Sequence, residues 1–385
     1  MKVSCLNKIS QFGLNTFNKN YEISEDIINS ELLMVRSFNM HEVEIGPNLI
    51  AVARAGAGVN NIPLEKMGDA GVVVFNTPGA NANGVKELVI AGMLMAARDL
   101  IGGNNWIKNN RHDVNILKTI EKAKSAFAGT EILGKTMLVV GLGAIGGKVA
   151  NACDCLGLKV IGYDPYLSDE AKALLNPGIE INNNLEESYP IADFISLHIP
   201  LLDTTKEMFD KTIFGQVKPG VVLLNFSRDQ LVNDSDLKVA LEAKTVGKYI
   251  TDFPNHFVAN LENVIAFPHL GASTEESEDN CAIMAAKQLM AFVEKGEIIN
   301  SVNYPNVKLD SCEAKQRMII LANNQPSIAR EIAKIFLSID DLVKAKVSKV
   351  RDNYAFYAFD IDGDIDKAII NALEKVDGIN KVRVI

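Results

Sequence analysis

One glycine-rich segment constrains the fold of this chain more than any other part of its sequence. It is a G-x-G-x-x-G pattern with the sequence Val139-Val140-Gly141-Leu142-Gly143-Ala144-Ile145-Gly146. The pattern directly follows the apolar run 136–140, and a second apolar run, 159–163, ends just before Asp164, 18 residues after Gly146. A strand, a glycine loop, a helix and a second strand that leads into an acidic residue are typical of a dinucleotide-binding Rossmann domain.

The residues of this segment have distinct physical roles in such a domain. Gly141 permits the tight turn, Gly143 lets the backbone approach a pyrophosphate, and Gly146 lets the helix pack closely on the strand. The helix begins near Ala144-Ile145, where free N–H groups favour an anion. Asp164 would accept hydrogen bonds from ribose hydroxyls and repel a 2′-phosphate, which predicts NAD rather than NADP. The alternative is a glycine-rich turn in a Rossmann domain that binds no nucleotide.

The rest of the chain predicts further parallel sheet and a separate tail. At roughly 100–200 residues per domain, 385 residues predict two or three domains. Apolar runs alternate with helical stretches at 3–6, 33–35, 49–54 and 72–75, and again at 193–197, 221–225, 248–251 and 264–267. This alternation is typical of doubly wound α/β sheets. After a polar boundary at 300–305, the tail has the strand and helix order βαββαβ, which is that of a ferredoxin-like domain.

These patterns predict an α/β fold with three parts. The family resemblance that the motifs below carry implies the exact division: residues 1–97 and 286–305 form a flavodoxin-like substrate domain, residues 98–285 the Rossmann-type NAD domain, and residues 315–385 the ferredoxin-like tail.

Composition and charge exclude several classes of function and location. The net charge is −9 and there is no basic block, which argues against a nucleic-acid or membrane-surface partner. The N-terminal segment lacks the apolar core of a signal peptide, and the longest apolar run, 88–97, has about half of the ~20 residues that a membrane span needs. Five scattered cysteines indicate a reduced, cytoplasmic protein without disulfides. The one close pair, Cys153 and Cys155, favours helix cysteines over a metal site, so no metal is expected.

Polar residues follow three of the predicted strands of the NAD domain. They lie in the segments 225–228, 252–254 and 268–274, which contain Arg228, Asp252 and His269. Because the carboxyl ends of parallel strands meet at one edge of a sheet, we expect these side chains to lie together. Taken singly, each has a plainer interpretation: a surface ion pair for the arginine, a turn for the aspartate, and a cap or packing residue for the histidine.

The chain resembles the D-isomer-specific 2-hydroxyacid dehydrogenases over nearly its whole length. The segments that carry the resemblance occur in family order: 54–61 (RAGAGVNN), 75–79 (FNTPG), Glu87-Leu88, 134–136 (GKT), 141–146, Tyr163-Asp164-Pro165, 197–200 (LHIP), 225–228 (NFSR), Asp252 and 268–274 (PHLGAST).

The resemblance implies roles for the strand-end residues. His269 would act as acid and base at the substrate oxygen, and Arg228 would hold the substrate carboxylate. Asp252 would fix the nicotinamide carboxamide. The resemblance implies further cofactor contacts at His198, Pro200, Phe226, Ser227 and Gly271.

In the substrate domain, Arg54, Ala55 and Gly56 would meet the substrate, and Arg54 suits a phosphate, although it could equally be a plain ion-pair residue. The resemblance thus implies NAD-dependent oxidation of 3-phospho-D-glycerate to 3-phosphooxypyruvate, the first step of serine synthesis. One alternative is another D-2-hydroxyacid dehydrogenase, such as a reductase of glyoxylate or another 2-keto acid. An alternative of a different class is a non-catalytic interaction protein that senses NAD.

One position departs from the family pattern. Members carry a glutamate shortly after the Asp-Phe-Pro turn, which pairs with the catalytic histidine and orients it. Here His256 occupies that slot, and Glu262 is the only acidic residue between Asp252 and His269. We therefore expect either that the enzyme tolerates the change or that its activity or substrate is altered.

The tail and one helical region carry expectations about assembly. The last 70 residues resemble an ACT domain, a regulatory module that often binds amino acids and pairs between subunits. The usual effector-binding histidine and glycine are absent near Ala322 and Ser327, which favours pairing over inhibition by L-serine. The helices around Trp106 resemble the dimer interface of the family, so a homodimer or homotetramer is expected.

Overall fold

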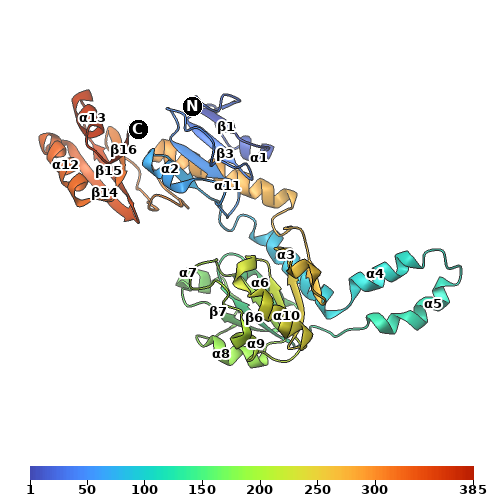
Figure 1. Ribbon diagram of the computed structural model, residues 1–385. Coiled ribbons are helices and arrows are strands. Elements are labelled where there is room, and N and C mark those ends of the chain that lie inside the picture. Colours follow the sequence, from blue (N-terminus) through green and yellow to red (C-terminus); the bar gives the residue numbers. More distant parts are fainter. The chain divides into compact units, whose positions relative to one another are not determined.

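The computed structural model describes all residues from 1 to 385, and the chain divides into two compact units. The first unit comprises residues 1–81 and 275–385, and the second comprises residues 82–274 (Figure 1). No helix in either unit combines the length and the apolar character that crossing a membrane requires.

The second unit is built on a seven-stranded sheet in which every pair of neighbours is parallel. The order across the sheet is β12-β11-β10-β9-β6-β7-β8. The strands are β6 (Thr136–Val140), β7 (Lys159–Tyr163), β8 (Glu180–Ile181), β9 (Phe194–Leu197), β10 (Val221–Asn225), β11 (Val246–Thr251) and β12 (Val264–Ala266). Strand β6 comes first in the sequence, β7 and β8 are added on one side of it, and β9 to β12 are added on its other side. The position between β6 and β9 is therefore the switch point where Rossmann sheets bind dinucleotides.

Helices cover both faces of this sheet, because its strands are buried on both sides. The α-helices are α3 (Ala82–Ala97), α4 (Leu100–Asn109), α5 (Ile116–Ala123), α6 (Gly146–Cys155), α7 (Asp169–Lys172), α8 (Leu185–Ser188), α9 (Lys211–Phe214) and α10 (Asp234–Glu242). Helices α4 and α5 form an arm that extends away from the sheet of their own unit and buries none of its residues (Figure 1).

The first unit contains a five-stranded parallel sheet with the flavodoxin-like order β2-β1-β3-β4-β5. Its strands are β1 (Lys2–Cys5), β2 (Glu22–Ser24), β3 (Leu32–Val35), β4 (Ala51–Arg54) and β5 (Val73–Phe75). The helices are α1 (Gln11–Leu14), α2 (Leu64–Asp69) and the long α11 (Glu275–Lys295). Helix α11 packs so closely on α1 that a side chain at Gly13 would collide with Ala282. The predicted parallel α/β architecture is confirmed in both units.

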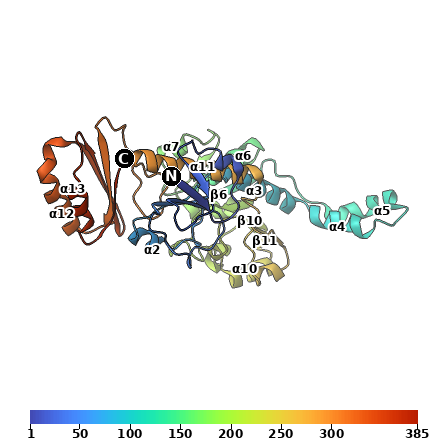
Figure 2. The same ribbon diagram turned by 90° about the horizontal axis from the view of Figure 1, so that it is seen from above.

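The tail forms a four-stranded antiparallel sheet with the order β14-β15-β13-β16 and two helices on one face (Figure 2). Its elements are β13 (Gln316–Asn323), α12 (Pro326–Phe336), β14 (Val343–Arg351), β15 (Tyr354–Ile361), α13 (Lys367–Glu374) and β16 (Ile379–Val384). This confirms the ferredoxin-like βαββαβ order that the sequence predicted.

Strand β13 alternates between two cores, and this joins the tail to the rest of the first unit. Met318 and Ile320 pack under α12 and α13. Ile319 and Leu321 point to the opposite face and share a core with Phe292 of α11. The face of the tail sheet that is not covered by α12 and α13 thus packs on α11, and the two form one continuous hydrophobic core.

The boundaries of the compact units differ from the boundaries that the sequence suggested. The predicted NAD domain begins after residue 97 and ends at residue 285, whereas the second compact unit begins after Asn81 and ends at Thr274. Helix α3 packs on α6, β10 and β11 and so belongs with the second unit, and all of α11 packs with the first. Apolar periodicity identifies a helix but does not show which sheet its apolar face covers.

The buried Arg317–Asp360 pair generates a prediction about stability. Arg317 is 4% exposed, and its guanidinium donates to both Asp360 carboxylate oxygens, at 2.5 and 2.8 Å, and to the carbonyls of Lys295 and Asp310. Arg317→Met leaves the carboxylate and two carbonyls without their donor, so we expect a loss of about 3–5 kcal/mol in the free energy of unfolding. Urea denaturation followed by circular dichroism measures it.

Lys315→Met is the matched control, because Lys315 directly precedes β13 and makes an exposed ion pair with Asp364. That pair should contribute about 1 kcal/mol or less. Equal losses in the two variants would show that the Arg317 pair does not fasten the tail.

Candidate active site

The glycine loop between β6 and α6 has the geometry that its sequence predicts. Gly141 has a φ of +91° and donates its N–H to the Tyr163 carbonyl at 2.7 Å. A Cβ at Gly141 would collide with the His198 carbonyl, and one at Gly146 would collide with the Gly141 carbonyl. At Gly143, by contrast, nothing lies within 4 Å of a Cβ position. The loop is therefore tight against its own sheet and open above Gly143, where a phosphate would approach the start of α6.

Asp164 is held beside this loop by its own hydrogen bonds. One carboxylate oxygen, Oδ2, accepts from the Leu142 N–H, and the other, Oδ1, accepts from the Tyr166 N–H, both at 2.9 Å. Each oxygen has a further lone pair. The carboxylate is thus fixed at the end of β7 and can still accept hydrogen bonds from a ribose.

The structure brings Arg228 and His269 close to one aromatic ring, that of Phe253. The Arg228 Cζ atom lies 5.6 Å from the centre of the Phe253 ring, and the His269 ring lies 4.3 Å from the same ring centre. These residues follow β10, β11 and β12, three neighbouring strands, which is why their side chains converge at one edge. A cation and an acid/base group beside the same ring suit a molecule that carries a carboxylate next to a hydroxyl or keto oxygen.

The His269 backbone is in the left-handed region, with a φ of +50°. Its N–H donates to the carbonyls of Asp252 and Phe267, both at 3.0 Å. A residue other than glycine in this region costs on the order of 1–3 kcal/mol and persists where the surroundings enforce it. The two hydrogen bonds therefore fix the His269 backbone, and its ring contacts that of Phe253.

Asp252 is the buried carboxylate of this site. Its Oδ2 accepts from the Gly271 N–H at 2.9 Å, whereas Oδ1 is buried and has no hydrogen-bond partner. Burial raises the pKa of Asp252, and the nearby charges of His269 and Arg228 act against that rise. An unpaired buried acceptor is costly, so the site is incomplete without a donor. An amide N–H₂ such as that of a nicotinamide carboxamide fits this oxygen.

The other predicted cofactor residues differ in which of their groups a cofactor could contact. The His198 imidazole bonds to the Ser196 hydroxyl at 2.8 Å, and burial lowers its pKa to about 3, so the ring is neutral at physiological pH. The Ser227 hydroxyl donates to the Leu197 carbonyl at 2.7 Å, and Pro200 is exposed. Phe226 is 5% exposed and stacks on Phe267 in the core, so only its backbone is available to a cofactor.

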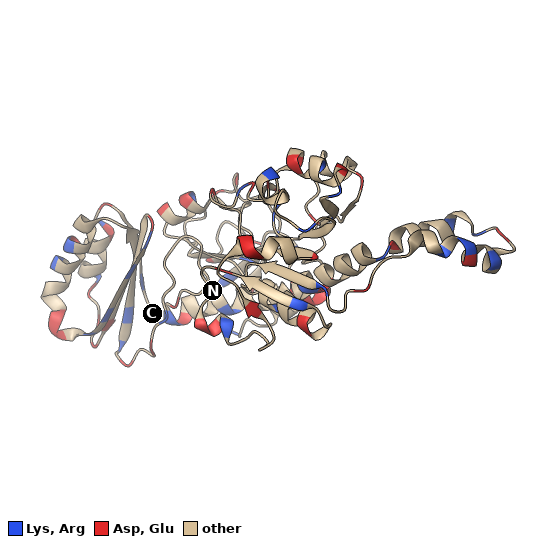
Figure 3. Ribbon diagram, turned by 90° about the horizontal axis from the view of Figure 1, so that it is seen from below, with Lys and Arg blue, Asp and Glu red and all other residues tan.

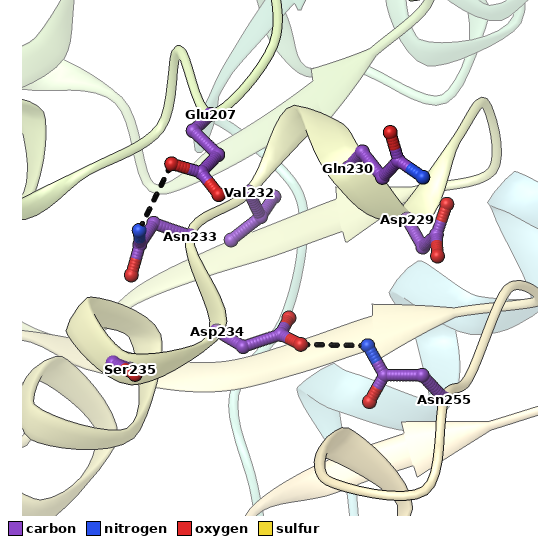
Figure 4. Close-up of a pocket in the computed structure, with 8 residues that line it drawn as sticks. All are labelled: Glu207, Asp229, Gln230, Val232, Asn233, Asp234, Ser235 and Asn255. Atoms are coloured by element: carbon purple, nitrogen blue, oxygen red, sulfur yellow. Dashed lines mark hydrogen bonds between the residues drawn. The ribbon is translucent and has the colours of Figure 1, made fainter.

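His256 lies on an exposed loop beside a polar pocket. The pocket has a volume of about 180 Å³ and is lined by Glu207, Asp229, Gln230, Val232, Asn233, Asp234, Ser235 and Asn255 (Figure 4). Asn255 ties this loop to α10 by donating to Asp234 at 2.6 Å. The His256 imidazole itself is exposed and makes no hydrogen bond, so its proposed influence on His269 remains a prediction.

The predicted substrate residues lie in the first unit, at the carboxyl end of β4. The Arg54 guanidinium lies against Gly56, whose φ of +153° no side chain would favour, and Ala55 is buried. Sequence reasoning missed Cys281, on whose thiol the charges of Arg54, Arg36 and Glu278 and a hydrogen bond with Thr77 act, and the ion pair between Arg36 and Glu278. Arg36 could have been found, because it directly follows the apolar run of β3 as Arg54 ends that of β4.

The chain is similar to known proteins of one enzyme family. Residues 90–271 match the family model described as "D-isomer specific 2-hydroxyacid dehydrogenase, NAD binding domain". A D-3-phosphoglycerate dehydrogenase of Haemophilus influenzae is 28% identical over 94% of this chain and 88% of its own length. The enzyme of that name from Methanocaldococcus jannaschii is 29% identical over 86% of this chain and 62% of its own length, and that from Rattus norvegicus 34% over 78% and 56%.

The fold also matches solved structures. The NAD⁺-bound 3-phosphoglycerate dehydrogenase of Entamoeba histolytica has a TM-score of 0.62 at 24% identity, over 79% of this chain and 98% of that one. The chain spans less than two thirds of the length of some of its relatives, as the Methanocaldococcus and Rattus enzymes show. Together with the glycine loop and Asp164, these matches show that the second unit contains the NAD-binding domain of the D-isomer-specific 2-hydroxyacid dehydrogenase family.

Proposed function

We propose that the protein oxidises 3-phospho-D-glycerate to 3-phosphooxypyruvate with NAD. The observation that carries this proposal is the convergence of Arg228, Phe253 and His269 at the edge of an NAD-binding sheet. Relatives named D-3-phosphoglycerate dehydrogenase support the choice of substrate.

The residues of the second unit then divide the chemistry. Arg228 binds the substrate carboxylate, and its guanidinium lies 5.6 Å from the centre of the Phe253 ring, which also contacts the His269 imidazole. His269 takes the proton from the substrate hydroxyl as the hydride leaves the same carbon, and it returns a proton to the keto oxygen in the reverse direction. NAD, when bound, supplies the hydride acceptor. Asp252, whose Oδ1 is unpaired, would accept a hydrogen bond from the carboxamide and so orient the nicotinamide.

In the first unit, we assign the substrate phosphate to the region of Arg54, Ala55 and Gly56. A guanidinium suits a phosphate because several N–H donors and a permanent charge face it at once. Another D-2-hydroxyacid dehydrogenase, acting on glyoxylate or another 2-keto acid, would have less use for this arginine. A non-catalytic NAD sensor would need neither Arg228 nor His269 beside Phe253.

We also propose that the chain assembles into a homodimer or homotetramer in the cytoplasm. The arm of α4 and α5 supports this, because it exposes Leu100, Ile107, Val114 and Leu117 with no partner in its own chain. The five cysteines are all free, which suits a reducing compartment. The ACT-like tail would be the module for pairing, whereas the loop before α12 lacks the usual effector residues.

The activity has a direct test. We expect NADH formation with 3-phospho-D-glycerate and little with D-lactate or D-glycerate. His269→Gln should lower kcat by about 10²–10⁴, because it removes the proton acceptor. Arg228→Lys should raise KM about tenfold, since the bidentate grip is lost.

Activity with glyoxylate or pyruvate alone in the reverse direction would favour the rival dehydrogenase, and NADH binding without turnover of any substrate would favour the sensor.

The His256 position generates a second prediction. If this slot tunes the catalytic histidine, a carboxylate introduced by His256→Glu stabilises the protonated imidazole of His269. The base in the oxidation direction is the neutral imidazole, so the acidic limb of the kcat/KM profile should move to higher pH. Glu262→Gln is the control and should leave the limb in place. An unchanged limb and rate in His256→Glu would show that this slot does not act on His269.

Cofactor choice gives a third prediction. Asp164→Asn retains a hydrogen-bond acceptor for the Leu142 N–H but removes the charge that repels a 2′-phosphate. The ratio of the NADPH to the NADH dissociation constant, from fluorescence titration, should fall by about tenfold, because one charge-assisted hydrogen bond to ribose is weakened as well. Asp169→Asn, at an exposed position of α7, is the control. An unchanged ratio in Asp164→Asn would contradict the assigned role.

A further inference from the structure

Three polar side chains lie in the core of the second unit, next to the turns that carry Arg228 and Phe253. Asn225 ends β10, Thr251 ends β11, and Tyr249 lies on β11; all three are at most 2% exposed. Asn225 and Thr251 are register partners, and Tyr249 lies two residues before Thr251, so the three side chains share one face of the sheet. Buried polar groups cost free energy unless they are hydrogen-bonded, so the bonds of this cluster define its role.

The Asn225 amide holds the turn that follows β10. Its Oδ1 accepts from the Ser227 N–H at 3.1 Å, and its Nδ2 donates to the Arg228 carbonyl at 2.8 Å and to the Tyr249 hydroxyl at 3.0 Å. A side-chain amide has two N–H donors, so both are occupied. The amide therefore holds Ser227 and Arg228 from both sides and fixes the backbone from which the Arg228 side chain leaves.

The Tyr249 hydroxyl connects this turn to the next strand end. Burial raises the pKa of Tyr249 to about 12, while hydrogen bonds with Asn225 and Thr251 act to lower it. The Thr251 Oγ1 atom accepts from the Phe253 N–H at 3.0 Å. A chain of hydrogen bonds therefore runs from the Arg228 carbonyl through three buried side chains to the backbone of Phe253, whose ring lies near the Arg228 guanidinium.

We propose that Tyr249 is a positioning residue for the substrate carboxylate and that it acts through Asn225 on Arg228. This rests on the proposed function and deepens it, because it names the core residue that sets the place of the carboxylate-binding guanidinium. Without the hydroxyl, one Asn225 N–H is buried without an acceptor, which costs more than the bond itself contributes. The amide relieves this cost by turning toward another acceptor, which releases the Arg228 carbonyl. His269 keeps its own backbone hydrogen bonds.

A cluster that only stabilises the core is the competing explanation, and the two can be separated. Loss of a purely stabilising hydroxyl would lower the midpoint of thermal unfolding but leave KM unchanged. A positioning hydroxyl acts on the binding of the carboxylate, so its loss raises KM, while kcat and the pH dependence that His269 sets stay nearly the same.

The test measures the Arg228 side chain directly in the full chain without ligand. NMR relaxation of its Nε–Hε group gives an order parameter, and the signal is assigned by its absence from Arg228→Lys. Because Arg228 Nη1 donates to the Ser227 carbonyl at 2.6 Å, its order depends on the turn that the amide holds. In Tyr249→Phe we expect a lower order parameter and a KM for 3-phospho-D-glycerate that is about threefold to tenfold higher, with kcat within about twofold. The acidic limb of the pH profile should not move.

Substitutions of Thr251 test the next bond of the chain. Thr251→Val removes the hydroxyl and keeps the shape of the side chain, so the order parameter and KM should change in the same direction as in Tyr249→Phe. Thr251→Ser keeps the hydroxyl and should retain the wild-type values of both.

Tyr189→Phe is the matched control. Tyr189 is 1% exposed in the same unit and its hydroxyl has no hydrogen-bond partner, so the substitution deletes a buried hydroxyl without breaking a network. An Arg228 order parameter in Tyr249→Phe equal to that of the wild type, or a KM no higher than that of Tyr189→Phe, would overturn the proposal. Failure of the dehydrogenase assay would instead overturn the proposed function, since the relaxation measurement needs no substrate.

Discussion

The contact between the Gly146 backbone and the Gly141 carbonyl is the constraint on which the rest of the site depends. No Cβ fits at either glycine, so α6 can start directly above the end of β6. This places free N–H groups at the switch point of the sheet, which is where a dinucleotide pyrophosphate is stabilised. Once the nucleotide lies along this edge, the ends of β10, β11 and β12 are the positions from which side chains can reach its nicotinamide.

Those strand ends supply a compact set of groups with complementary roles. Arg228 and His269 both lie near the Phe253 ring, and the buried Asp252 has one oxygen held by Gly271 and one unpaired. Burial raises the pKa of Asp252, and the charges of His269 and Arg228 act against this rise, so both groups lie within electrostatic reach of its carboxylate.

The sequence predicted the features that depend on local pattern and could not predict those that depend on long-range packing. The glycine loop, the βαββαβ tail and the strands of both parallel sheets except β2 and β8 follow from apolar runs and turn residues, and the sequence predicts them close to their observed bounds. Strands β2 and β8 are short edge strands, of three and two residues, and no apolar run marks them. The Arg36–Glu278 pair joins residues that no local pattern connects, and the burial of Phe226 depends on its stacking against Phe267. The assignment of α3 to the second unit likewise depends on which sheet its apolar face covers.

The central claim is that a hydride passes from the C2 position of a phosphorylated D-2-hydroxy acid to NAD while His269 removes the hydroxyl proton. The most direct measurement uses 3-phospho-D-glycerate that carries deuterium at C2, with mass spectrometry of the reduced nucleotide. The account predicts one deuterium in each NADH formed and slower hydride transfer than with the unlabelled substrate. NADH without deuterium, or no NADH at all, would contradict it.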